Sequence, residues 1–180
     1  MLRNLTLSLT IIILTACQSN SMKPLQTVAY IDLERFMGDW YVIASIPTFI
    51  EKNAYNAVET YHLNEDGTIA TTFTFNKGGF DGPLKRYTPT GYVQDSASQA
   101  TWGMQFIWPI KAEYLVIYLS DTYDLTVIGR NKRDYVWIMA RTPTIAEAKY
   151  QMLIDFLAEQ NYDVTQLRKV PRREDNPESS

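Results

Sequence analysis

The chain has 180 residues, enough for one domain and too few for two domains of ordinary size. Hydrophobic residues make up 46% and charged residues 21%, the balance of an ordinary globular chain. The formal net charge of −3 argues against a nucleic-acid partner, because proteins that bind phosphate backbones carry a basic excess. The sequence contains a single cysteine, so it forms no intramolecular disulfide.

Residues 1–16 have the layout of a secretory signal peptide. Arg3 gives a positive start, and the apolar stretch after it is too short to cross a bilayer as a mature helix. The tetrapeptide Leu14-Thr15-Ala16-Cys17 resembles the bacterial lipobox, in which the cysteine thiol carries lipid. We therefore predict lipidation of Cys17, with residues 17–27 as the lipidated tether. A plain secretory signal is the alternative.

The residue after Cys17 bears on the membrane that receives the anchor. Gln18 stands there, in place of the aspartate that resembles an inner-membrane retention signal. Several acyl chains give stable anchoring where one chain is marginal. For a Gram-negative source, these features predict a lipid anchor in the outer membrane and a protein that faces the periplasm.

From Asp39 onward, short runs of β-branched and aromatic residues are separated by turn residues, the pattern of β-strands. The candidate strands are Trp40–Ile46, Ala54–Leu63, Thr68–Asn76, Leu84–Gln94, Ala100–Phe106, Tyr114–Leu119, Leu125–Arg130 and Val136–Arg141. Short connections between consecutive strands favour pairing of sequence neighbours, and closure removes exposed edges. We predict an all-β domain over residues 28–170, an eight-stranded antiparallel up-and-down barrel.

One helix is predicted after the strands, along roughly Ile145–Gln160, because apolar residues recur there at helical spacing. Thr144 is the candidate N-cap, and Glu147 completes a T-x-x-E capping box. We expect this C-terminal helix to pack on the outside of the barrel. Beyond it, Asp163–Val170 is a candidate short ninth strand, and residues 171–180 are typical of a flexible tail.

Three short motifs resemble the signatures of the lipocalins. The first is Gly38-Asp39-Trp40, which follows a short helical segment at Ile31–Phe36. The second is Ser120-Asp121-Thr122-Tyr123, which departs from the family's T-D-Y by the threonine between aspartate and tyrosine. The third is Arg141, at the end of a strand that contains tryptophan. The resemblance extends over about Val28 to Val170 and is strongest to the bacterial outer-membrane lipocalins, relatives of apolipoprotein D.

The resemblance implies a structural role for the motif residues at the closed end of the barrel. In the family, the arginine lies across the floor tryptophan, a cation–π contact worth about 1–2 kcal/mol when desolvated. The residues implied to close the barrel are Gly38, Trp40, Asp121, Tyr123 and Arg141.

Strand periodicity predicts which side chains face the interior, because alternate side chains point to the same side. The phase is set by Trp40 and Arg141 on the first and last strands, and an analogous choice on the second strand places Asn56, Val58, Thr60 and His62 inside. The predicted ligand-binding residues are Trp137, Met139, Tyr135, Val42, Ala44, Asn56, Val58 and Thr60, with Trp137 the first candidate.

An eight-stranded barrel encloses either packed side chains or one small ligand, and a largely apolar wall with a few polar groups is typical of a small-molecule site. With the resemblance, this predicts a carrier that binds fatty acids or lysophospholipids for storage or transport in the cell envelope. We expect a binding protein rather than an enzyme, without cofactor or metal. A lipocalin-fold enzyme of isomerase type, acting on a bound lipid or isoprenoid, is the alternative.

Two further alternatives and one open question remain from the sequence. His62, the single histidine, is a candidate axial ligand for a haem carrier. A purely structural envelope protein would have its barrel filled by large side chains. Exposed apolar residues near Phe106–Ile110 are compatible with a homodimer or with membrane contact.

Overall fold

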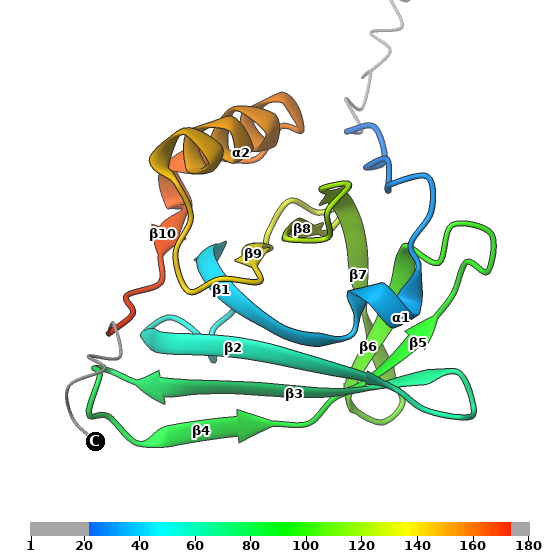
Figure 1. Cartoon of the computed structure of the whole chain (residues 1–180), viewed down its shortest axis with the longest axis horizontal. Helices are drawn as coiled ribbons and strands as arrows, with labels where there is room; N and C mark the ends of the chain where they lie inside the picture. Colours follow the sequence, from blue (N-terminus) through cyan, green and yellow to red (C-terminus); the bar gives the residue numbers. More distant parts are fainter. Residues whose placement is uncertain (1–21, 174–180) are drawn as a thin grey trace, which may run out of the picture.

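The strands form a closed barrel in the computed structural model, which describes residues 22–173 (Figure 1). Their bounds are β1 Gly38–Ile46, β2 Ala54–Leu63, β3 Thr68–Lys77, β4 Leu84–Tyr87, β5 Thr90–Val93, β6 Thr101–Ile107, β7 Ile110–Leu119, β8 Leu125–Gly129 and β9 Val136–Ala140. Sequence neighbours pair antiparallel, and β1 pairs with both β2 and β9, so the sheet closes on itself. The predicted eight-stranded antiparallel barrel is confirmed.

The segment predicted as one strand from Leu84 to Gln94 is two strands in the structure, β4 and β5. Both pair with β3, so they occupy one position in the barrel. The interruption falls at Thr88 and Pro89, because proline has no backbone N–H for the ladder. The carbonyl of Pro89 still accepts a hydrogen bond from the Thr71 N–H at 3.1 Å, which holds the break against β3.

One long helix, α2 (Glu147–Glu159), lies outside the barrel, as predicted (Figure 1). Its buried residues Tyr150, Leu153 and Leu157 pack against the outer faces of β1, β8 and β9. The predicted capping box is wrong. The N-cap is Ala146 without a side-chain hydrogen bond, because the Thr144 carbonyl is held in the preceding turn by the Thr142 hydroxyl at 2.7 Å.

Apolar side chains form two separate clusters, one inside the barrel and one between its outer wall and α2. The inner cluster is centred on aromatic residues from several elements: Phe36, Trp40, Tyr61, Trp102 and Tyr114. These rings fill the end of the barrel where β1 begins. The other end is therefore the one with room for a ligand.

The short helix α1 (Leu33–Phe36) crosses the filled end, near the segment predicted as helical. Asp32 caps it by accepting a hydrogen bond from the Arg35 N–H at 3.2 Å. After α2, the predicted ninth strand is only the turn η1 (Val164–Gln166) and the two-residue β10 (Arg168–Lys169), which pairs with β1.

The segments that precede and follow the predicted barrel domain in the sequence both contact it. Leu25, inside the predicted tether, is buried against the outer cluster, and its N–H donates to Asn131 Oδ1 at 2.7 Å. At the other end, the Arg173 N–H donates to Asn56 Oδ1 at 2.9 Å. The predicted signal peptide, Cys17 and the last seven tail residues lie outside the described residues. Within residues 22–173, no helix has the length and apolarity needed to cross a membrane.

Candidate ligand-binding site

The filled end of the barrel is closed by Arg141 and Trp40. The guanidinium carbon of Arg141 lies 3.9 Å from the centre of the Trp40 ring, and the indole N–H donates to the Phe36 carbonyl at 2.8 Å. The guanidinium donates to four backbone carbonyls, those of Arg35, Phe36, Asp39 and Tyr123. One side chain therefore ties α1, β1 and the loop before β8 together.

Gly38 makes this close approach possible. Its φ of +91° is in the left-handed region, and a Cβ there would lie 3.4 Å from Nη1 of Arg141. A larger residue would be strained at this φ and would crowd the guanidinium. The glycine of the first motif is thus required by the backbone at the closed end.

The loop of the second motif supports the same end, but its side chains act differently from the prediction. The Tyr123 hydroxyl accepts from the Asp32 N–H at 2.9 Å, and Arg35 lies 3.9 Å over the Tyr123 ring. Asp121 contributes its backbone carbonyl, which accepts from Arg35 at 3.3 Å.

The carboxylate that organises this loop is Asp124, which the sequence analysis did not select. It accepts from the hydroxyls of Ser120 at 2.5 Å and Thr122 at 2.7 Å. These hydrogen bonds lower the pKa of Asp124, and Lys149 of α2 adds an ion pair at 3.2 Å. The inserted Thr122 is therefore accommodated as an extra hydrogen-bond donor.

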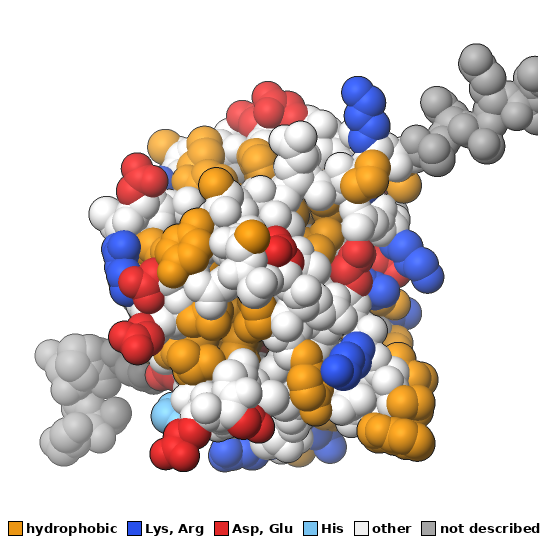
Figure 2. Space-filling view, turned by 90° about the vertical axis from the view of Figure 1, so that its right-hand side faces the viewer, with side chains coloured by type: hydrophobic (Ala, Val, Ile, Leu, Met, Phe, Trp, Pro, Cys, Tyr) orange, Lys and Arg blue, Asp and Glu red, His pale blue; other side chains and the backbone are white. Residues whose placement is uncertain are grey.

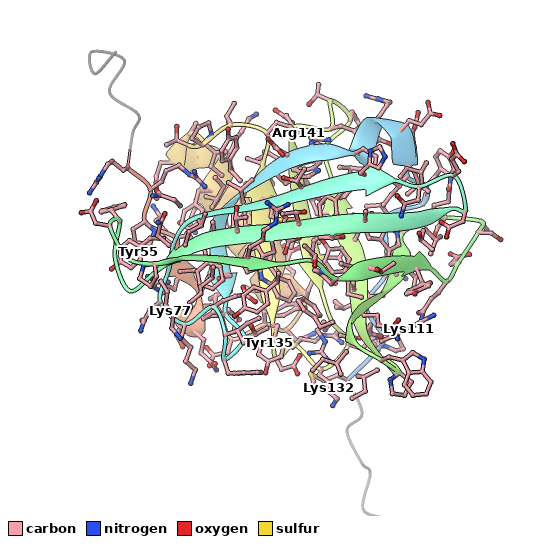
Figure 3. All side chains as sticks on the ribbon, turned by 90° about the horizontal axis from the view of Figure 1, so that it is seen from below. Tyr55, Lys77, Lys111, Lys132, Tyr135 and Arg141 are labelled. Carbon is pink, nitrogen blue, oxygen red and sulfur yellow. The ribbon has the colours of Figure 1, made fainter. Side chains whose placement is uncertain are left out.

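A cavity of about 490 Å³ opens at the end opposite Trp40 and Arg141. Figure 3 shows Arg141 on one side of the barrel and Tyr135 and Lys132 on the other. Most of the wall is apolar or aromatic, and the loop between β1 and β2 lies over it. The wall residues include Phe49, Ile50, Phe73, Tyr87, Met104, Phe106, Ile107, Ala112, Tyr114, Tyr135 and Trp137.

Two of the predicted interior residues on β9 and its approach line this cavity. Trp137 and Tyr135 are wall residues, and their ring centres lie 6.4 Å apart. Met139 also faces inward, but it is fully buried in the core beneath the cavity. The inward direction of these three side chains was predicted correctly, because Arg141 at the closed end fixes the alternation along the strand.

On β1 the predicted inward direction is right for Val42, which is a core residue and not part of the cavity wall, and wrong for Ala44. The register with β9 shifts between these residues, because a β-bulge lies there. Val42 packs inside the barrel, whereas Ala44 joins the cluster under α2. After the bulge, Ser45 is the buried residue opposite Trp137.

On β2 the predicted phase is wrong for Asn56, Val58, Thr60 and His62. The inner face carries Ala57, Glu59 and Tyr61. Asn56 has a φ of +52°, and the register with β3 shifts between Tyr55 and Val58, so a bulge again resets the alternation.

The outer-face residues of β2 have partners or solvent of their own. Thr60 donates to Asp39 Oδ1 at 2.6 Å, and Asn56 donates to Asn76 Oδ1 at 3.2 Å. His62 is exposed and points away from the barrel interior. It is therefore not positioned to ligate a haem inside the barrel.

Two buried carboxyl groups, Glu51 and Glu59, line the cavity. Glu59 accepts a short hydrogen bond from the Tyr61 hydroxyl and a longer one from Tyr114 at 3.4 Å. Burial and the negative charge of Glu51 raise the pKa of Glu59 to about 8. Glu59 is therefore mostly protonated at neutral pH.

Glu51 lies in the loop between β1 and β2 and reaches across the cavity to β9. It accepts from the Trp137 indole N–H at 2.7 Å and from the Thr48 hydroxyl at 2.6 Å. Burial raises its pKa, although these hydrogen bonds oppose the rise. Neither carboxyl was predicted from the sequence. The signal available was the Glu59–Tyr61 alternation on β2, which the chosen phase placed outside.

Comparison with known proteins agrees with this architecture. The lipocalin-like domain family matches residues 31–172. This chain is a lipocalin. The temperature-induced lipocalin-1 of Arabidopsis thaliana is 34% identical over 170 residues, 88% of each chain. The outer membrane lipoprotein Blc of Citrobacter freundii is 29% identical over 159 residues, 86% of this chain and 88% of the relative.

Solved structures show the same fold at lower identity. Insecticyanin from the tobacco hornworm Manduca sexta superposes with a TM-score of 0.67 at 14% identity, covering 84% of the lipocalin and 86% of insecticyanin. The cockroach allergen Per a 4 gives 0.63 at 17% identity, over 86% and 97% of the two chains. These likenesses support the fold alone.

The mouth of the lipocalin is rich in exposed apolar side chains. They come from the β1–β2 loop and the β6–β7 hairpin, and they are Phe49, Phe106, Ile107, Trp108 and Ile110. Lys111 and Lys132 lie on the same side of the barrel as Tyr135 (Figure 3). On the face drawn in Figure 2, acidic and basic side chains are interspersed among hydrophobic ones, and no extended basic surface is present there.

Proposed function

We propose that this lipocalin binds a fatty acid or a lysophospholipid in the cavity and stores or transports it in the cell envelope. The observation that carries the proposal is the cavity of about 490 Å³, whose wall is mostly apolar and aromatic. This volume falls in the range of small-molecule sites. Burial of an acyl chain contributes about 25 cal/mol for each Å² removed from water, which supplies most of the binding free energy.

The charges around the cavity favour one orientation of the lipid. Arg130 is a wall residue whose buried Nε has no hydrogen-bond partner among the described residues. Glu51 and Glu59 are buried in the same cavity, where an anionic head group would meet them unfavourably. The acyl chain therefore enters first, and the anionic head stays near the mouth.

Lipid anchoring in the outer membrane is part of the same proposal. It is supported by the lipobox-like Leu14-Thr15-Ala16-Cys17 and by relatives named outer membrane lipoprotein Blc. The plant relative at 34% identity is not named a lipoprotein. The lipid anchor therefore needs a test of its own, apart from the test of ligand binding. Mass spectrometry of the protein extracted from its source membranes should find acylated Cys17 as the first residue. An unmodified cysteine or an uncleaved leader would refute the anchor.

We propose binding rather than catalysis as the role of the cavity. An isomerase would need an acting side chain in the cavity, and the single histidine, His62, lies on the outer face. Tyr135 lines the cavity and stays a candidate. The alternative would be supported if a bound lipid or isoprenoid were turned over, and if Tyr135→Phe abolished turnover without weakening binding.

The ligand class is tested by displacement of a fluorescent fatty acid from the mature protein, together with native mass spectrometry of any lipid that co-purifies. We expect displacement by free fatty acid and a weaker complex in Trp137→Ala, because this substitution removes a wall ring and the partner of Glu51. Trp108→Ala is the matched control, since Trp108 is 82% exposed. Absence of both displacement and co-purified lipid would eliminate this ligand class.

A further inference from the structure

Glu59, on the wall of the cavity, has one oxygen without a hydrogen-bond partner among the described residues. The hydroxyls of Tyr61 and Tyr114 both donate to Oε2. In the part of the chain that the structure describes, no residue bonds to Oε1, although the side chain is only 8% exposed. Oε1 is therefore left for a ligand in the cavity, and once the carboxyl is ionised it can accept a hydrogen bond from a ligand that brings a donor.

A second polar atom of the cavity wall is also unpaired. Thr71 is buried on the inner face of β3, and its hydroxyl has no hydrogen-bond partner among the described residues. Thr71 pairs with Tyr61 in the register of β2 and β3, and Glu59 pairs with Phe73. Glu59 and Thr71 are therefore diagonal neighbours on one inner face, close enough to contact the same polar group.

Aromatic rings surround these two polar groups. Tyr114 stacks between Trp102 at 5.3 Å and Trp137 at 6.4 Å, measured between ring centres. Phe73 and Tyr87 complete the wall on the side of β3 and β4. Aromatic faces attract cations, and this attraction grows when water is excluded. Carboxyl groups enclosed by aromatic rings are a suitable environment for an ammonium group.

We propose that the deep part of this cavity is a binding subsite for the protonated amine of an amphiphilic ligand, held by Glu59 Oε1 and Thr71 Oγ1 within the aromatic wall. This goes beyond the proposed function, because it assigns a second ligand class with the opposite orientation. A fatty acid places its charge at the mouth, whereas an amine places its charge at the inner end.

The other charged groups of the cavity agree with a cation at that end. The titratable side chains that face Glu59 are Glu51 from the β1–β2 loop and the phenols Tyr61 and Tyr114. Farther along the wall stand Tyr87, Tyr135, Glu113 and Arg130. Glu51 and Glu59 are therefore the acidic groups nearest to the proposed ammonium. An ammonium there stabilises the ionised form of Glu59, which burial and the charge of Glu51 disfavour, whereas a ligand carboxylate would disfavour it further.

The proposal is tested by calorimetric titration of the mature protein with three ligands of equal chain length: decylamine, decan-1-ol and decanoate. At neutral pH we expect decylamine to bind about tenfold more tightly than decan-1-ol, the gain expected when a hydrogen bond becomes charge-assisted. Because Glu59 is mostly protonated beforehand, amine binding should release about one proton per ligand, measured by comparing buffers of different ionisation enthalpy. Decan-1-ol should release none.

Two variants test whether the preference for decylamine over decan-1-ol arises at Glu59 and Thr71. Glu59→Gln keeps an acceptor for Tyr61 and Tyr114 but removes the charge, so decylamine and decan-1-ol should bind within about twofold of each other. Thr71→Val should reduce the preference for the amine in part. Glu65→Gln, an exposed glutamate in the β2–β3 turn, is the matched control and should keep the full preference.

The outcomes separate this inference from the proposed lipid function. Equal affinities of decylamine and decan-1-ol in the wild-type protein, or no proton release, would overturn the amine subsite while decanoate binding still supports the lipid carrier. Loss of decanoate binding alone would overturn the lipid function and leave the subsite standing. If Glu59→Gln fails to fold, the proton release of the wild-type protein decides the matter.

Discussion

At the scale of single residues, Arg141 joins several elements of this lipocalin at the closed end of the barrel. It combines a cation–π contact with Trp40 and hydrogen bonds to four backbone carbonyls. Its planar guanidinium reaches all of these groups at once, which the single ammonium of lysine does not do. The stability of the closed end is therefore concentrated in one position.

Replacement of Arg141 should destabilise the fold without reshaping the cavity. We expect Arg141→Ala to lower the free energy of unfolding by about 3 kcal/mol, from the lost cation–π contact and the carbonyls left unpaired. Arg141→Lys should recover only a minor part. Urea denaturation measures both, with Arg86→Ala on the exposed side of β4 as control. If Arg141→Ala lost no more unfolding free energy than Arg86→Ala, Arg141 would not stabilise the closed end.

Glu59 should make the stability of the protein depend on pH. Its pKa is about 8 in the folded state and near 4.5 when unfolded, so the folded state holds a proton that the unfolded state releases. The resulting stabilisation is complete below the unfolded pKa and is lost as pH rises through the folded pKa.

Thermal melts between mildly acidic and mildly alkaline pH check this sign. The wild-type melting temperature should fall across this range, and it should fall less in Glu59→Gln, whose amide does not titrate. The surface variant Glu65→Gln should follow the wild type. A parallel pH profile for Glu59→Gln would show that burial of this carboxyl has no consequence for stability.

At the scale of elements, the helix and the sheet differ in how well the sequence predicts them. Both the existence of α2 and its place outside the barrel follow from its apolar face, whereas its N-terminus depends on the local turn held by Thr142 and Thr144. In β1 and β2, bulges beside Val42 and Asn56 reset the two-residue alternation. A single extra residue reverses the side on which every later residue falls, and no simple sequence pattern marks it.

The packing of α2 should contribute to stability independently of ligand binding. Leu153 is fully buried against the outer wall, so Leu153→Ala should cost about 3 kcal/mol of unfolding free energy through lost burial and the remaining void. Met152→Ala on the same helix should cost far less, because Met152 is 40% exposed. Affinity for a fatty acid should be similar in both variants. A large loss of affinity in Leu153→Ala would indicate that α2 shapes the cavity.

At the scale of the whole molecule, the closed barrel and the position of its floor are predictable because the three family motifs are anchored to one end. The wall of the cavity is less predictable. Trp137 and Tyr135 follow from the phase set by Arg141, but Glu51 and Glu59 do not, because Glu51 reaches inward from a loop and Glu59 follows a bulge. Burial of a glutamate in the wall of a largely apolar cavity also runs against the usual hydrophobic pattern.

We propose that the ligand binds inside the barrel, in the cavity opposite Trp40. The most direct measurement is the affinity for a fluorescent fatty acid of a variant with that space filled. Ala112 lines the cavity on β7, so Ala112→Trp should place a large ring in it, whereas Ala97→Trp adds the same ring on an exposed loop. We expect loss of binding in Ala112→Trp and wild-type affinity in Ala97→Trp, with both variants folded. Wild-type affinity in a folded Ala112→Trp would contradict binding inside the barrel.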